Sequence, residues 1–246
     1  MTKQSKNTLI TAIAILAGLA LLLYGLPAIL SHKPTPEEIA DLKARLAQTK
    51  ATTDSLRRLQ RARAQRDSAE AAQQKHWEEI KNDVAQIAAI TSPMRVTEDK
   101  LESRTWYEPK SRPKSLSADW IGCYFGIMKD RERPRLRMVL QSVFSSTLFI
   151  KGYKIKADTN LITIMDDDVK RDYSSGNTLE HSDVVVGAEE YRALRAVANA
   201  KEATIRAVGA DYYHDRKVTP KEQAAIAEVL SVYEKLLGMS SQEGHQ

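Results

Sequence analysis

The apolar and polar positions divide the chain into three regions with different patterns. Leu9 to Leu30 are almost continuously apolar and uncharged, and residues 37–92 contain no glycine and no proline. From Asp119 onward, apolar and polar residues alternate in short runs, which is typical of strands in antiparallel sheets. The pattern predicts an N-terminal transmembrane helix, a long α-helical coiled-coil stalk, and a C-terminal α+β domain with a mainly antiparallel sheet and two helices.

The first region has the length of a membrane span. A helix from Leu9 to Leu30 would extend about 33 Å, close to the ~30 Å hydrocarbon core of a bilayer. A cleaved signal peptide is the alternative, but its apolar region usually has only about 7–15 residues, and no Ala-x-Ala-like cleavage site follows the apolar run before Ser31. We therefore expect a cytoplasmic stub at 1–7 and a transmembrane helix at 8–31.

The flanking charges predict the orientation of this segment. Residues 1–7 include Lys3 and Lys6 and no acidic residue, whereas Glu37, Glu38 and Asp41 follow the apolar run. By the positive-inside rule, the N-terminus stays in the cytoplasm. The expected location is the cytoplasmic membrane, crossed once, with the C-terminal domain outside in the periplasm.

The second region reads as one long helix, the expected stalk at 35–92. Thr35 and Pro36 with Glu38 form an N-terminal cap, and the run ends before Pro93, which gives a helix of about 55 residues. Apolar residues follow heptad spacing in two blocks, which predicts a homo-oligomer through the stalk. The blocks are Ile39, Leu42, Leu46, Thr49, Thr53 and Leu56, and then Trp77, Ile80, Val84, Ile87 and Thr91.

A basic cluster separates the two blocks. It contains Arg57, Arg58, Arg61 and Arg63. The ordinary interpretation is a solvated helix surface. The functional one is a binding strip for an anionic partner, because guanidinium groups form bidentate contacts with phosphate and carboxylate. Outside the cytoplasm, that partner would be an anionic lipid or polysaccharide surface or an acidic envelope protein, and nucleic acid is not expected.

The third region divides into a linker at 93–118, an α+β domain at 119–238 and a disordered tail at 239–246. Linker character follows from Pro93, Pro109 and Pro113 among many charges. The expected strands are Trp120–Lys129, Arg135–Phe144, Thr147–Ala157, Leu161–Met165 and Glu202–Val208, and the expected helices are Ala188–Ala200 and a capped helix that begins at Thr219-Pro220.

The order of these elements resembles a poorly characterised module of bacterial envelope proteins. The resemblance covers about Asp119–Leu237 and includes the strand with Thr204-Ile205-Arg206, the turn Tyr212-Tyr213-His214-Asp215 and the capped terminal helix. It implies an extracytoplasmic accessory domain, and it implies neither an activity nor a ligand.

Composition excludes several classes of protein. The chain has 246 residues, a net charge of +5 that is spread along it, and one cysteine. A single cysteine rules out an internal disulfide framework, and no cysteine and histidine set has zinc-module spacing. Glycine motifs for dinucleotides, P-loops and nucleophile elbows are absent from the sequence. The sequence therefore predicts no metal and no cofactor.

A few residues could bind a metal ion or take part in catalysis, and each also has an ordinary structural interpretation. Asp166-Asp167-Asp168 lacks the spacing of an EF-hand loop and reads as a solvated turn. His181 with Asp183 and His214 with Asp215 are candidate acid and base pairs without a nucleophile tied to them by a motif. Cys123 lies in an apolar run and reads as a buried hydrophobe, although an intermolecular disulfide stays open.

The leading hypothesis is a membrane-anchored, non-enzymatic envelope tether or adaptor that presents a distal binding domain. Tyr212, Tyr213, His214 and Asp215 are expected to form an exposed recognition loop. One alternative is a spanin-like or secretion-associated component that bridges the envelope. The other is an envelope hydrolase that uses His181 or His214 as a base.

Overall fold

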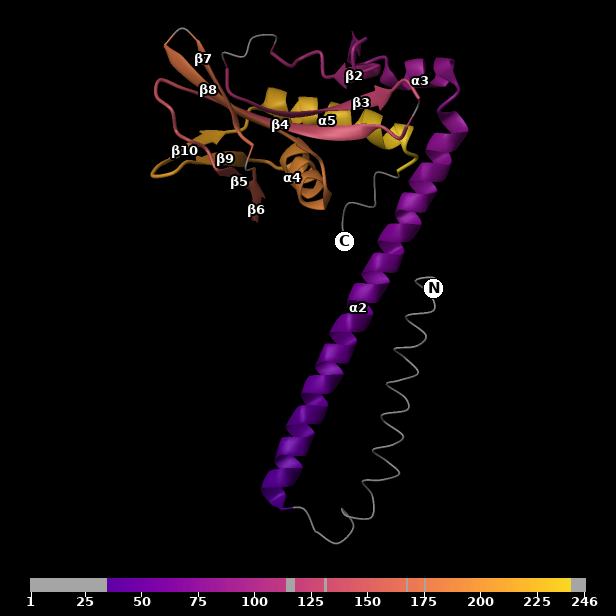
Figure 1. Ribbon diagram of the computed structural model, residues 1–246, viewed down its shortest axis with the longest axis vertical. Helices are drawn as coiled ribbons and strands as arrows, with labels where there is room; N and C mark the ends of the chain where they lie inside the picture. The colour runs from indigo at the N-terminus through magenta and orange to yellow at the C-terminus, as the bar shows by residue number, and fades with distance from the viewer. Residues whose placement is uncertain (1–34, 114–117, 131, 167, 175, 240–246) are drawn as a thin grey trace. The chain divides into compact units, whose positions relative to one another are not determined.

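The computed structural model describes residues 35–113, 118–130, 132–166, 168–174 and 176–239 (Figure 1). The chain divides into two compact units, residues 1–66 and residues 67–246. In the first unit, residues 36–66 belong to helix α2 (Pro36–Ile80). The second unit contains the end of α2, three further helices and ten strands among the described residues.

The strands of the second unit form two antiparallel sheets. The six-stranded sheet has the order β1-β2-β3-β4-β8-β7, and the four-stranded sheet has the order β10-β9-β5-β6. The first sheet comprises β1 (Arg95–Asp99), β2 (Arg104–Glu108), β3 (Trp120–Met128), β4 (Arg135–Phe144), β7 (Lys170–Ser174) and β8 (Asn177–Val185), and the second comprises β5 (Gly152–Ala157), β6 (Asn160–Met165), β9 (Ala203–Val208) and β10 (Tyr213–Lys217).

The expected architecture of transmembrane helix, coiled-coil stalk and α+β domain with two helices is wrong. The C-terminal region is β-rich, with two antiparallel sheets where the sequence predicted a single, mainly antiparallel one. Within the described ranges, no helix is both long and apolar enough to cross a bilayer. The segment predicted to do so, 8–31, lies outside the described residues.

The expected stalk helix does not run to Ser92. It ends at Ile80, and α3 (Val84–Thr91) begins after a turn where the Asp83 side chain accepts the backbone N–H of Gln86 at 2.9 Å. Such an N-cap favours a new helix start over continuation, because the side chain competes with the helical hydrogen bonds.

Most residues of the second heptad block pack in the core of the domain. Trp77, Ile80, Ile87 and Thr91 are buried within the second unit. Apolar residues of the first block behave differently, because Ile39, Leu46 and Leu56 are exposed in the single chain. A partner helix for them stays a prediction.

The segment predicted as a linker, 93–118, contributes two strands. β1 and β2 pair as an antiparallel hairpin, and β2 pairs with β3. Inside the sheet, the Tyr107 ring stacks on Phe125 with centroids 5.0 Å apart. Prolines flank this hairpin without interrupting either strand, so proline content alone indicated a linker incorrectly.

A buried carboxylate joins the two sheets. Glu180 of β8 is fully buried and accepts the backbone N–H groups of Leu148, Phe149 and Ile150 at 2.6 to 2.9 Å, together with Arg171 Nε at 3.0 Å. The strand expected at Thr147–Ala157 therefore begins only at Gly152, because the preceding residues wrap around this carboxylate.

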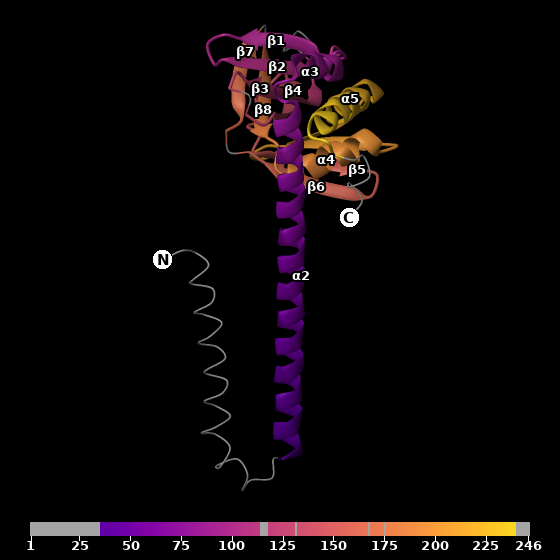
Figure 2. The same ribbon diagram turned by 90° about the vertical axis from the view of Figure 1, so that its right-hand side faces the viewer.

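The helices α4 (Ala188–Asn199) and α5 (Pro220–Leu236) lie at the two segments of the domain where the sequence predicted helices. α5 packs on β3, and α4 packs on α5 and on β5 and β6, so α5 lies between the six-stranded sheet and α4 (Figure 2). The expected cap of α5 is also present: Thr219 Oγ1 accepts the Glu222 N–H at 3.3 Å, and the Glu222 carboxylate accepts the Thr219 N–H at 2.7 Å.

Glu222 does more than cap its helix. Its buried carboxylate also accepts the backbone N–H of Ile121 at 2.8 Å and two hydrogen bonds from Arg216, at 2.8 and 3.1 Å. Burial alone raises the pKa of Glu222, but the bonds from Arg216, Thr219 and Ile121 outweigh burial and hold the pKa below its usual 4.5. The ionised group therefore ties α5 to the start of β3 and to β10.

We predict that Glu222→Gln lowers the free energy of unfolding at pH 7 by about 2 kcal/mol. Because the folded-state pKa is depressed, the contribution is complete above the unfolded-state pKa and is lost as the pH falls through the folded-state value. Urea unfolding of both proteins at pH 7 and at about pH 3 should show the difference shrinking. An equal difference at both pH values would contradict the assignment, and Glu189→Gln on the exposed side of α4 is the control.

Candidate binding surface

The four residues predicted as a recognition loop lie on an edge strand. Tyr213, His214 and Asp215 belong to β10, and Tyr212 precedes the strand. Because side chains alternate along a strand, Tyr213 and Asp215 share one face, whereas His214 lies on the other and meets the Phe144 ring edge-on at 5.3 Å. The expected loop is therefore wrong, and only two of its members share a face of the sheet.

Arg206 of β9 organises these two residues. Its guanidinium donates to both oxygens of Asp215 at 2.6 and 2.7 Å and lies 3.9 Å from the centre of the Tyr213 ring. The hydrogen bonds from Arg206 hold the pKa of Asp215 below its usual range. Bidentate pairing and stacking together fix the plane of this guanidinium on the surface.

The same face continues across the four-stranded sheet, and we call it the open face. Cross-strand pairing places its residues in three rows, each running from β6 through β5 and β9 to β10. The opposite face is buried through Ile162, Ile164, Tyr153, Ile155 and Ile205. The rows of the open face are Met165, Gly152, Val208 and Tyr213; Thr163, Lys154, Arg206 and Asp215; and Leu161, Lys156, Thr204 and Lys217.

The open face is basic at its centre and apolar at its ends. It carries Lys154, Lys156, Arg206 and Lys217 against one acidic residue, Asp215. Lys217 pairs with Glu202 beside the face. Lys156 also interacts with Glu202 electrostatically, but no described carboxylate lies within ion-pair distance of Lys154 or Lys156. The two lysines are exposed and therefore available to an anionic partner.

Large apolar side chains flank these charges. Leu161, Met165 and Tyr213 are exposed to 65%, 66% and 60%. A sheet face of lysine, arginine and exposed apolar side chains suits contact with another macromolecule better than catalysis on a small molecule.

The arginine cluster of α2 does not form one strip. Arg57, Arg58 and Arg61 lie within about 100° of one another around the helix axis, while Arg63 lies at least about 120° from each of them. All four are exposed in the first unit. The structure thus fits a solvated helix surface and places three of the four on a common side.

Neither proposed histidine and aspartate pair forms a hydrogen bond in the described structure. Asp183 instead accepts Arg137 Nε at 2.8 Å and the Tyr124 hydroxyl at 2.5 Å, while His181 Nδ1 is buried with no partner among the described residues. Burial and then the bond to Asp183 raise the pKa of Tyr124. Asp215, for its part, is held by Arg206 on the face opposite His214.

The aspartate run also has ordinary partners. Asp166 accepts the Asp168 N–H at 2.9 Å, and Asp168 pairs with Lys170 at 2.6 Å; Asp167 lies outside the described residues. Across the described ranges, no group of three or more histidine, cysteine or acidic residues is placed to hold a metal ion.

Cys123 faces the interior of the domain. It is 3% exposed, and its sulfur lies 4.0 Å from the carbonyl oxygen of Ile226 in α5. Burial raises the pKa of the thiol, so the reactive thiolate is disfavoured. An intermolecular disulfide through Cys123 would require this part of the core to open.

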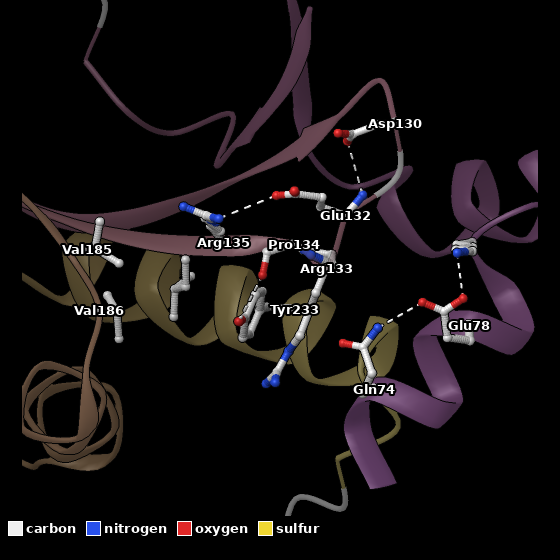
Figure 3. A pocket seen from close by; sticks show the side chains of 12 residues that line it. Gln74, Glu78, Asp130, Glu132, Arg133, Pro134, Arg135, Val185, Val186 and Tyr233 are labelled. Carbon is white, nitrogen blue, oxygen red and sulfur yellow. Dashed lines mark hydrogen bonds and ion pairs between the residues drawn. The ribbon is translucent and has the colours of Figure 1, made fainter. Parts of the chain in front are cut away.

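Sequence reasoning missed a polar cleft in the second unit (Figure 3). It has a volume of about 660 Å³ and is lined by residues of α2, the β3–β4 connection and α5. Two ion pairs lie in it, Arg135 with Glu132 at 3.3 Å and Lys81 with Glu78 at 2.5 Å. Arg133 donates to the amide oxygen of Gln73, and Asp130 accepts the backbone N–H of Glu132 at 3.3 Å. Most polar groups of the cleft are therefore already engaged with neighbours in the domain.

A second cavity, of about 730 Å³, lies between α3 and the strands β1 to β3. Its lining includes Ile87, Met94, Tyr107 and Ile127, all of which also belong to or pack against the core. No signal in the sequence pointed to it, because its strands come from the segment that was predicted as a linker.

No protein-family model, curated protein or solved structure matches this chain. The resemblance to an envelope module therefore stays a prediction.

Proposed function

We propose that this protein is a membrane-anchored adaptor whose β-rich domain binds an acidic protein partner through the open face. The anchor is the apolar segment Leu9–Leu30, whose sequence has the length of a span. The binding element is the basic centre of the four-stranded sheet. In this account the protein recruits its partner and performs no chemistry on it.

The observation that carries the proposal is the unpaired charge of Lys154 and Lys156. Nearly all described arginines of the domain have carboxylate partners, as Arg206 has Asp215 and Arg216 has Glu222. Lys154 and Lys156 are two of several unpaired lysines among the described residues, and they are distinguished by sharing one face of the sheet with Arg206. Two exposed lysines at alternate positions of one strand project from the same side, about 7 Å apart along it. Acidic side chains at the same spacing on a partner protein would form ion pairs with both lysines, and their charge would speed the association of the two proteins.

The neighbouring groups favour a protein partner. Leu161 and Met165 on one side of the lysines and Tyr213 on the other would be covered by apolar side chains of a protein surface. Interfaces of this kind combine an apolar contact with charged groups that set the orientation. The stacked pair of Arg206 and Tyr213 is already ordered, which reduces the entropy that binding costs.

The binding half of the proposal is tested with labelled poly-L-glutamate as the probe and the full-length chain in detergent. We predict that Lys154→Gln combined with Lys156→Gln weakens binding about tenfold, because two charge-assisted contacts are lost. Fluorescence anisotropy measures the affinity. Lys129→Gln with Lys221→Gln, which changes the net charge equally but lies off the open face, should have little effect. Equal losses in both double variants would contradict a site on this face.

The anchoring half is tested independently by fusing alkaline phosphatase to the C-terminus. The enzyme is active only after export, so we predict an active, membrane-associated fusion. Replacing Leu16 and Leu19 with Arg should abolish both activity and membrane association, because two charges make insertion of the segment costly. Activity only from a cytoplasmic reporter would overturn the proposed location without bearing on the binding face.

A further inference from the structure

The outer edge of β6 differs from the other three sheet edges of the described structure. β1, β7 and β10 each carry three charged side chains in five residues, which discourages pairing with another strand. β6 has the sequence Asn-Leu-Ile-Thr-Ile-Met, with no charge and no proline. It therefore lacks the features that protect an edge.

The backbone of this edge is ready to pair. The Asp166 N–H donates to the Lys151 carbonyl beyond the Met165 and Gly152 pair, which sets the alternation of hydrogen bonds between β5 and β6. In that alternation, the N–H and C=O groups of Leu161, Thr163 and Met165 point away from β5. β6 is the last strand of its sheet, so these groups face outward (Figures 1 and 2).

The three outward residues are complementary to themselves. Thr163 lies midway between Leu161 and Met165, so a two-fold axis at Thr163 sets Thr163 against its equivalent and Leu161 against Met165 of the second copy. Each of the three resulting pairs exchanges two hydrogen bonds, about six in all. The exposed Leu161 and Met165 side chains would then cover one another across the junction.

We propose that β6 pairs antiparallel with β6 of a second copy of this chain and joins the two four-stranded sheets into one. A second copy fits because β6 itself is neutral, so self-pairing brings no like charges together. The lysines of β5 stay about 14 Å from those of the other copy, beyond the Debye length of about 8 Å at physiological salt. A strand with acidic side chains would have no oppositely charged residue on β6 to pair with.

The pairing has a consequence for binding. Both open faces would lie on the same side of the joined sheet, because residues paired across an antiparallel junction project alike. The dimer would thus present two basic centres to one partner surface. A short junction is a small interface, so we expect the dimer to dissociate on dilution.

The first test places a thiol on the axis. Thr163→Cys in the full-length chain should be cross-linked to dimer by a short bis-maleimide, since paired Cα atoms would lie about 5.5 Å apart. Thr97→Cys, at the centre of the charged edge strand β1, is the matched control. We expect at least about fivefold more dimer from Thr163→Cys. Equal yields, or cross-linking of Thr163→Cys to a different protein alone, would overturn the proposal.

A charge swap tests the register. One copy carries Leu161→Cys with Thr163→Lys, and the other carries Met165→Cys with Thr163→Glu, so the thiols face each other only across the proposed axis. The mixture should cross-link, because opposite charges meet at the axis. The same thiols with Thr163→Lys in both copies should not cross-link. Equal cross-linking in the two mixtures, or none in either, would overturn this register. Dimerisation through α2 alone would not distinguish the mixtures.

Discussion

The carboxylate of Glu180 is the group on which the arrangement of the two sheets depends. It is fully buried, and its four hydrogen bonds come from three successive backbone N–H groups and from Arg171. A buried charge is stable only when it is fully satisfied in this way. The segment that leads into β5 therefore has one position relative to β8, and the four-stranded sheet keeps one face against the helices and leaves the other exposed.

Local signals in the sequence predicted a good part of this fold. The cap at Thr219 and Glu222 located α5, alternating residues located β4 and β5, and apolar runs located β3 and β6. The predictions from sequence failed where a long-range contact decides the conformation. Trp77 and Ile80 fit a heptad seam as well as a helix that ends in a core, and only the packing distinguishes the two. The burial of Glu180 could not be predicted from the sequence, because an isolated acidic residue in a strand is usually exposed.

The candidate site was predicted in part for the same reason. Tyr213 and Asp215 were selected as exposed, which they are, but they were assigned to a loop that the structure replaces with an edge strand. Lys154 and Lys156 lie in the strand expected at Thr147–Ala157, at polar positions that alternate with apolar ones and therefore face solvent. Their juxtaposition with Arg206 depends on the pairing of β5 with β9, which brings together residues about fifty positions apart and has no local signature.

The open face and the edge of β6 belong to one sheet, so both proposals require that this sheet be a rigid part of the domain. Hydrogen exchange of the full-length protein, followed by mass spectrometry, tests that requirement directly. If Glu180 holds the sheets together, the amides of Leu148 to Ile150, β5 and β9 should exchange as slowly as those of β3 and β4, by global unfolding alone. Much faster exchange of the four-stranded sheet than of the six-stranded sheet would contradict the account.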